Sequence, residues 1–218
     1  MNYGVIFDMD GTLVDNMKYH MMAYHVFLKK YGIDMTDEKF LGESNGKTNN
    51  DIMRWLFGAD ISQDRVDELS NEKEALYRDL YAPHMMLAPG LKPIMEQLHA
   101  EGVPMAVGSS AINENINFVL DGLEIRKYFK AIVDSSQVAK GKPDPEVFLR
   151  CAKGMGVEPQ NCVVFEDAWI GIDAAHSAGM KVITITTVLT REQLKKGDVI
   201  VDSFTEVNVG TIKSLLKK

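Results

Sequence analysis

The chain has 218 residues, of which 45% are hydrophobic and 25% are charged. Such a composition is typical of a globular protein and excludes a chain that is mainly disordered or fibrous. The formal net charge of −7, with no block of lysines or arginines, argues against nucleic acid and anionic membrane surfaces as partners. A site that binds phosphate esters therefore needs its own local cations, such as a metal ion and one or two lysines.

Neither the N-terminal segment nor the cysteines indicate export. The first apolar run has no basic region before it and breaks at Asp8, so we do not expect a signal peptide. No uninterrupted apolar stretch reaches the length of about 18 residues that spans a bilayer. Cys151 and Cys162 form no C-x-x-C pattern and are expected to be buried thiols. These features predict a cytoplasmic protein.

Short apolar runs alternate along the chain with stretches of helical spacing. The first run, at 3–7, ends abruptly in Asp-Met-Asp-Gly-Thr, which indicates a buried strand that leads into a loop. Further runs lie at 103–108, 131–133, 162–165, 181–186 and 199–201. The alternation predicts an α/β fold with a Rossmann-like parallel sheet core flanked by helices, whose ligand site lies at the carboxyl ends of the strands.

Residues 16 to about 82 interrupt this alternation, because they contain no convincing strand and their apolar residues recur at intervals of three and four. We predict an inserted small α-helical domain at 16–82, with the core domain formed by 1–15 and 83–218. Pro89-Gly90 marks the return to the core. The first helix of the insert carries a stripe that we interpret as a bundle core in preference to a ligand surface, made of Met17, Met21, Tyr24, Phe27 and Tyr31, with Gly32 at its C-cap.

A helix of the core domain is expected to begin near Asp144. The apolar residues that follow recur at helical spacing from Val147 to Met155. We expect Asp144 to be the N-cap and Pro145 to be the first helical residue, because proline lacks the N–H that this position leaves unused.

Two acidic pairs follow predicted strands. Asp8 and Asp10 end the first, and Glu166-Asp167 end another directly before a helix. Carboxyl ends of parallel strands share one edge, where two like charges ~5 Å apart repel by on the order of 3 kcal/mol at an effective dielectric near 20. Such a cluster needs a cation or protons. Oxygen ligands without histidine or cysteine favour Mg²⁺.

Two further polar positions also follow predicted strands. Ser109 could hold phosphate oxygens with its hydroxyl and nearby backbone N–H groups, and Lys142 could offset the charge of a bound phosphate. Each feature alone is more often ordinary surface or helix-cap chemistry. Their occurrence together, in this order and each after a strand, favours a phosphate site.

With these motifs the whole chain resembles the haloacid dehalogenase superfamily, most nearly β-phosphoglucomutase and its phosphatase relatives. The resemblance implies that Asp8 is the nucleophile, that Asp10 is the general acid and base, and that Ser109 and Lys142 grip the phosphoryl group. It implies Mg²⁺ held by the Asp8 carboxylate, the Asp10 backbone carbonyl and Asp167, with Glu166 close by. The helical insert resembles the cap that closes over the site in this superfamily.

The choice between hydrolase and mutase depends on cations that a second phosphate would need. The mutase pattern has an arginine and a lysine where this chain carries Asn49 and Ile112. His20 and Asn113 match the pattern and are candidate substrate or cap residues, and Lys47 is a candidate substitute for the missing arginine. We therefore favour a monophosphate hydrolase over a mutase.

Other activities stay open at this point. They are inorganic pyrophosphate hydrolysis and, outside enzymes, a regulatory module that binds a phosphorylated ligand without turnover. A dehalogenase is disfavoured, because the dehalogenases of the superfamily lack an acid at the place of Asp10. The expected partner is a small phosphorylated metabolite, with no nucleic acid or membrane partner, and the chain is expected to be a monomer.

Overall fold

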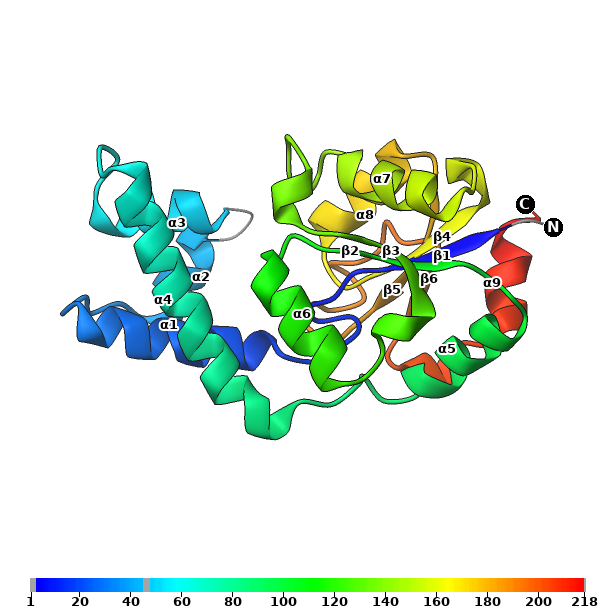
Figure 1. Cartoon of the computed structure of the whole chain (residues 1–218), viewed down its shortest axis with the longest axis horizontal. Helices are drawn as coiled ribbons and strands as arrows, with labels where there is room; N and C mark the ends of the chain where they lie inside the picture. The colour runs from blue at the N-terminus through cyan, green and yellow to red at the C-terminus, as the bar shows by residue number, and fades with distance from the viewer. Residues whose placement is uncertain (1–2, 45–47, 218) are drawn as a thin grey trace. The chain divides into compact units, whose positions relative to one another are not determined.

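The computed structural model describes residues 3–44 and 48–217, without the side chains of residues 41, 42 and 44. It divides into two compact units, Met1–Asp15 with Met85–Lys218, and Asn16–His84. Figure 1 shows a sheet flanked by helices in the first unit and helices alone in the second. The predicted residue Lys47 lies outside the described residues.

The first unit contains a parallel sheet whose described strands follow the order β3-β2-β1-β4-β5-β6. The strands are β1 (Gly4–Phe7), β2 (Met105–Gly108), β3 (Phe129–Val133), β4 (Cys162–Glu166), β5 (Lys181–Ile185) and β6 (Val199–Val201). Every residue of β1, β2 and β4 is buried, as expected of short apolar strands covered on both faces. The predicted Rossmann-like α/β fold is confirmed.

Helices cover both faces of this sheet (Figure 1). On one face lie α7 (Glu146–Met155) and α8 (Trp169–Ser177), and on the other α5 (Leu91–Ala100), α6 (Asn113–Gly122) and α9 (Val209–Leu215). Both cysteines lie in the apolar layer under α7 and α8, so the expectation of buried, unpaired thiols is confirmed.

The strand order reverses direction at β1. From β1 the chain runs to β2 and β3 on one side, then crosses to β4, β5 and β6 on the other. In open α/β sheets the crevice at such a reversal, outside the carboxyl ends of the strands, is where ligands bind. The loops after β1 and β4 therefore meet at the natural binding edge of the fold.

The start of α7 differs from the sequence-based expectation. The helix begins at Glu146, and its N-cap is Pro145 instead of Asp144. The Asp144 carboxylate still accepts a hydrogen bond from the Glu146 N–H, at 3.0 Å. The first N–H groups of a helix have no partner within it. Asp144 accepts one of them as an N-cap would, although it lies one residue before the N-cap.

In the second unit, all regular structure among the described residues is helical. It contains α1 (Met17–Lys30), α2 (Asp37–Ser44), α3 (Asn49–Phe57), α4 (Gln63–Tyr81) and a short 3₁₀ turn (Ala82–His84). Tyr24 and Phe27 of the predicted stripe are buried in its core, where Met21 and Tyr31 pack as partly buried residues. Met17 does not join them, because at the first position of α1 its side chain is 36% exposed.

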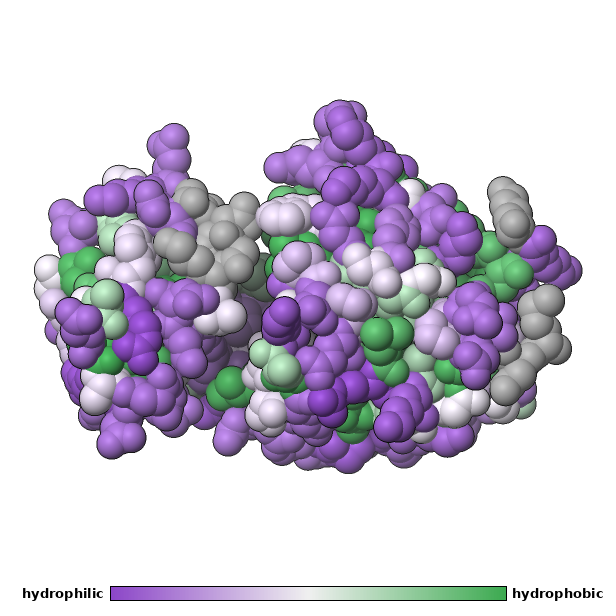
Figure 2. Space-filling view, turned by 90° about the horizontal axis from the view of Figure 1, so that it is seen from above, coloured by the Kyte–Doolittle hydropathy of each residue, from purple (hydrophilic) through white to green (hydrophobic). Residues whose placement is uncertain are grey.

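The surface of the chain is mainly polar on the face seen in Figure 2, where hydrophobic residues form small separate groups. Large apolar side chains that are exposed include Met22, Val26, Met86 and Trp169. No helix in the described ranges is both long and apolar enough to cross a bilayer.

Candidate active site

The pairing of β1 with β4 brings the two acidic motifs together. Phe7 pairs with Phe165, and the N–H of Asp8 donates to the Phe165 carbonyl at 3.0 Å. Asp8 and Glu166 are the next residues along the two strands, and Asp167 follows. All three residues are buried, with at most 6% of the residue exposed. The predicted convergence of these three acids is therefore present in the structure.

Lys142 joins this cluster from the loop after β3. Its Nζ lies 2.6 Å from Asp8 Oδ1 and 2.5 Å from Glu166 Oε1, and the side chain is 4% exposed. The ammonium also lies 4.8 Å from the centroid of the Phe148 ring, a distance typical of a cation–π contact. Burial opposes its charge, but Asp8 and Glu166 together raise the pKa of Lys142 above its ordinary value. The lysine is therefore a fixed cation.

One ammonium does not balance three carboxylates. Burial, with the charges of Glu166 and Asp10 adding to it and Lys142 opposing, raises the pKa of Asp8 to about 7. Burial and the charges of Glu166 and Asp8 likewise raise the pKa of Asp167 well above its usual range. Both shifts have the same cause, which is an excess of buried negative charge.

The residues after Asp10 explain why this motif contains glycine and threonine. Gly11 has φ of +80°, and a Cβ built on it would lie 2.2 Å from Asp167 Oδ2. Only glycine allows the loop to approach the carboxylate so closely. The hydroxyl of Thr12, which is fully buried, donates to Asp167 Oδ1 at 3.4 Å. The Thr187 hydroxyl donates to the Gly11 carbonyl and fixes the loop from the other side.

Glu166 is fixed by its own backbone and by α8. Its Oε2 accepts the N–H groups of Asp167 and Ala168, at 2.8 and 2.9 Å. A Cβ on Gly171 would lie 1.7 Å from Glu166 Oε1, so the helix leaves room for this side chain only because it carries glycine there. Glu166 therefore orients Lys142 and the Asp167 loop.

Ser109 directly follows β2, which pairs with β1 on the side opposite β4. It is 2% exposed, its N–H donates to the Val133 carbonyl at 3.0 Å, and its hydroxyl oxygen accepts the Ala111 N–H at 3.1 Å. The serine thus lies at the same sheet edge as Asp8, in a turn held by backbone hydrogen bonds.

The remaining candidates have other contacts. The Asn113 amide donates to Asp134 Oδ2 at 3.2 Å, which links the start of α6 to the loop after β3. In the helical unit, the His20 ring stacks on Tyr77 with centroids 3.7 Å apart, and its Nδ1 lies 4.0 Å from Glu74 Oε2. Asn49, which stands where the mutase pattern has arginine, donates to Glu74 Oε1 at 2.7 Å.

The donor set fits a magnesium ion. Asp8 and Asp167 offer hard oxygen ligands, and a divalent cation would offset the negative charge that raises both pKa values. In the described part of the chain, no group of three or more histidine, cysteine, aspartate or glutamate side chains is arranged to hold a metal. Mg²⁺ usually keeps several waters and needs only one or two protein carboxylates, which Asp8 and Asp167 could supply.

The fold and this cluster define a Rossmann-like α/β protein with an aspartate–lysine site at the carboxyl ends of its strands. Residues 5–185 match the family of haloacid dehalogenase-like hydrolases, and the chain belongs to this family. The expected type of enzyme, a haloacid dehalogenase superfamily phosphatase or phosphotransferase, is thereby confirmed.

The relatives of this chain include both a phosphatase and a phosphoglucomutase. The chain is 35% identical to fructose-1-phosphate phosphatase YqaB of Escherichia coli (strain K12), across 84% of this chain and 95% of that protein. It is also 35% identical to β-phosphoglucomutase of Bacillus subtilis (strain 168), across 81% and 80%. A solved haloacid dehalogenase hydrolase of family IA, variant 3, from Entamoeba histolytica HM-1:IMSS has a TM-score of 0.91 at 27% identity, covering 99% and 100%.

Magnesium should stabilise the folded protein through Asp167. At a Mg²⁺ concentration 100-fold above the dissociation constant, linkage predicts a gain of about 2.7 kcal/mol in wild type. Asp167→Asn should lose most of this gain, while its metal-free form should be at least as stable as wild type, because one buried negative charge is gone. Thermal unfolding with and without Mg²⁺ measures both effects.

The matched control is Asp173→Asn, an acid of α8 that pairs with Lys196 at the surface. It should retain the full magnesium gain. An equal gain in Asp167→Asn and wild type would contradict the assignment of Asp167 as a ligand.

Proposed function

We propose that the protein is a Mg²⁺-dependent phosphatase that hydrolyses a small phosphorylated metabolite, a sugar phosphate or a similar monoester, through an aspartyl phosphate on Asp8. The observation that carries this proposal is the buried Asp8 carboxylate, which lies at the end of β1 in contact with Lys142 and in the same cluster as Asp167. The family membership and the phosphatase among the relatives support it.

In the proposed first step, an oxygen of Asp8 attacks the phosphorus atom in line with the leaving oxygen. The new bond joins Asp8 to phosphorus as the bond to the leaving oxygen breaks. Lys142 and the Ser109 hydroxyl hold the phosphoryl oxygens, and the fixed ammonium stabilises their charge. A magnesium ion held by the Asp8 and Asp167 carboxylates and the Asp10 carbonyl would supply further charge neutralisation.

Asp10 is proposed to move the protons. It gives its proton to the leaving oxygen in the first step and takes a proton from water in the second, when that water attacks the phosphorus and releases phosphate. Asp10 lies two residues after Asp8, and its charge adds to the burial that raises the pKa of Asp8. The cycle returns both aspartates to their starting forms.

A β-phosphoglucomutase activity is the second candidate, because of the relative from Bacillus subtilis. A mutase must hold a second phosphate with additional cations. The Asn49 side chain is neutral, and it is engaged by Glu74 and by the Tyr24 hydroxyl, at 2.7 and 3.2 Å. Its neutrality favours the hydrolase. Pyrophosphate hydrolysis and binding without turnover are tested by the same experiments.

We propose that the helical unit Asn16–His84 is the cap that the family resemblance implies. Its candidate functional residues include His20 and Lys47. Asn113 is proposed to position the loop after β3 through Asp134, in addition to any contact with substrate. We further propose a monomer located in the cytoplasm.

Asp8→Asn should lower turnover by at least about 10³-fold, because the amide is a poor nucleophile. No phosphoenzyme should form, and the variant should unfold at the same temperature as wild type or higher, since it loses one of the crowded negative charges. Steady-state assays, intact-mass measurement and thermal unfolding test this. Undiminished turnover would refute Asp8 as the nucleophile.

The effect of Asp10→Asn on the rate of phosphoenzyme formation should depend on the leaving group of the substrate. An alkyl phosphate needs a proton on its leaving oxygen, so its phosphoenzyme formation should slow by about 10²-fold or more. Phosphoenzyme formation from p-nitrophenyl phosphate, whose leaving group is stable without a proton, should slow far less. Single-turnover kinetics on both substrates measure the difference, and equal losses would count against Asp10 as the acid.

The substrate class is tested with purified enzyme and a panel of phosphorylated metabolites. The panel includes sugar monophosphates, pyrophosphate, and β-glucose 1-phosphate with a trace of bisphosphate primer. We expect phosphate release from sugar monophosphates and little isomerisation, each scored separately. Isomerisation that exceeds phosphate release would establish the mutase alternative instead, and bound phosphate esters without turnover would indicate the regulatory module.

A further inference from the structure

The loop between β3 and α7 brings Lys142 to the carboxylate of Asp8. Its regular structure among the described residues is one short 3₁₀ turn, Ser135–Gln137. The stretch just before the lysine, residues 139–141, is exposed, whereas the Lys142 side chain is only 4% exposed. Apolar packing therefore does not hold this stretch, and its position must depend on hydrogen bonds.

Glu146 accepts these hydrogen bonds from its place at the start of α7. Its Oε2 accepts the backbone N–H groups of Ala139 and Lys140, at 2.7 and 3.3 Å. The two donors lie three and two residues before Lys142. Hydrogen bonds to an ionised acceptor are stronger than those between neutral groups. One side chain thus ties the loop to the helix directly before the lysine.

The other oxygen of Glu146 is held by Arg150, one turn further along α7. Arg150 Nε and Nη2 donate to Glu146 Oε1, at 2.8 and 2.6 Å. Hydrogen bonds from Arg150 and from the Ala139 N–H lower the pKa of Glu146, so its carboxylate is ionised near pH 7. An ion pair of this spacing at a surface contributes little to stability by itself. Here it fixes the side chain whose second oxygen holds the loop.

The helix α7 gives these contacts a firm support. Phe148, two residues after Glu146, is fully buried in the apolar layer under α7 and α8. Lys142 itself lies within a turn, because the Asp144 N–H donates to the Gly141 carbonyl at 3.0 Å. The Asp144 carboxylate accepts the Glu146 N–H in turn. The segment that carries the lysine is therefore attached to the helix both before and after it.

The contacts of the ammonium group must change during the proposed reaction. Lys142 Nζ contacts Asp8 Oδ1 and Glu166 Oε1 in the structure. When an oxygen of Asp8 bonds to phosphorus, this carboxylate loses its negative charge, and the ammonium must then pair with the phosphoryl oxygens. A loop that is fixed at its backbone keeps the ammonium within reach of them, and a displacement of about 1 Å can cost up to 10²-fold in rate.

We propose that Glu146 is a positioning residue for phosphoryl transfer, which holds the loop before Lys142 against α7 and so keeps the ammonium in place for the phosphoryl oxygens. The inference rests on the proposed function, in which Lys142 grips the phosphoryl group. Glu146 acts through the lysine and needs no contact with the substrate.

The test is the dissociation constant of orthovanadate, whose oxygens resemble those of a phosphoryl group in transfer, for the full-length protein with Mg²⁺. Calorimetric titration should show a rise of about fivefold in Glu146→Ala, because the ammonium is less well placed. Lys142→Met should cost about 30-fold, because a charge-assisted hydrogen bond is lost. The double variant should match Lys142→Met within about twofold, since Glu146 acts only through the lysine.

A conservative variant tests the role of the acceptor oxygen. Glu146→Gln should bind orthovanadate within about twofold of wild type, because its amide oxygen can still accept both backbone N–H groups. The comparison of Glu146→Gln with Glu146→Ala decides the inference even where Lys142→Met does not fold.

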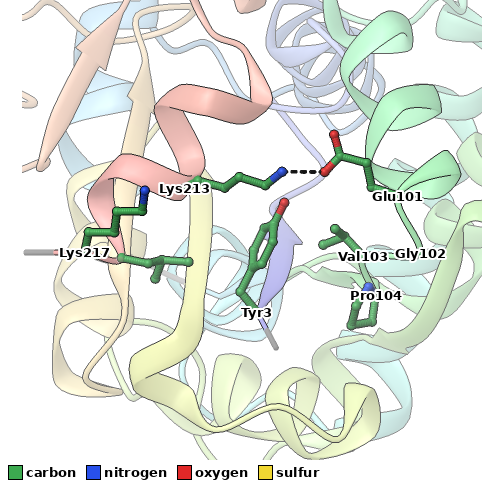
Figure 3. A pocket seen from close by; sticks show the side chains of 8 residues that line it. Tyr3, Glu101, Gly102, Val103, Pro104, Lys213 and Lys217 are labelled. Carbon is green, nitrogen blue, oxygen red and sulfur yellow. Dashed lines mark hydrogen bonds and ion pairs between the residues drawn. The ribbon is translucent and has the colours of Figure 1, made fainter. Parts of the chain in front are cut away.

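The matched control is Glu101→Ala. Glu101 pairs with Lys213 at 2.7 Å and accepts the Gln97 amide at 3.1 Å, beside the cavity shown in Figure 3. It lies in the turn that leads into β2, whereas Asp8 follows the end of β1, so the two lie at opposite edges of the parallel sheet. The control should leave the dissociation constant unchanged.

Two kinds of failure can be told apart. Wild-type affinity in Glu146→Ala, an equal loss from Glu146→Ala with and without Lys142→Met, or Glu146→Gln as weak as Glu146→Ala would overturn the inference. Wild-type affinity in Lys142→Met, or no binding by the wild type, would instead contradict the proposed function itself.

Discussion

The site depends on one electrostatic constraint, which is that three buried carboxylates, those of Asp8, Glu166 and Asp167, gather around a single lysine among the described residues, Lys142. Buried charges persist only when they are paired, so the cluster has a strong demand for additional positive charge. The pKa values of Asp8 and Asp167 are raised because burial and the neighbouring carboxylates disfavour their charged forms. A divalent ion would satisfy this demand and would leave Asp8 ionised, which is the form that can attack phosphorus.

The pairing of the strands fixes the positions of these carboxylates. Because β1 pairs with β4 in register, Asp8 and Glu166 lie side by side at the point where the strand order reverses. Glycine at positions 11 and 171 leaves space that any side chain would fill, and the carboxylates of Asp167 and Glu166 occupy it.

The sequence predicted those features that follow from local pattern. Strand–helix alternation predicted the α/β fold, and the position of acids after strands predicted the convergence of Asp8, Asp10, Glu166 and Asp167. It did not predict contacts that depend on tertiary packing, such as the close approach of Gly171 to the Glu166 side chain. Thr12 was within reach of sequence reasoning, because it belongs to the first motif. The exposure of Met17 was not, because helical spacing does not tell where a stripe ends.

The most direct test of the central claim is a high-resolution crystal structure of the protein grown with Mg²⁺. The account predicts one ion with near-octahedral coordination, bound by oxygens of Asp8 and Asp167 and by the Asp10 carbonyl at roughly 2.1 Å, with water at the remaining positions. Lys142 should remain in contact with Asp8 or Glu166. An ion bound elsewhere, or none at this edge at saturating Mg²⁺, would contradict the account.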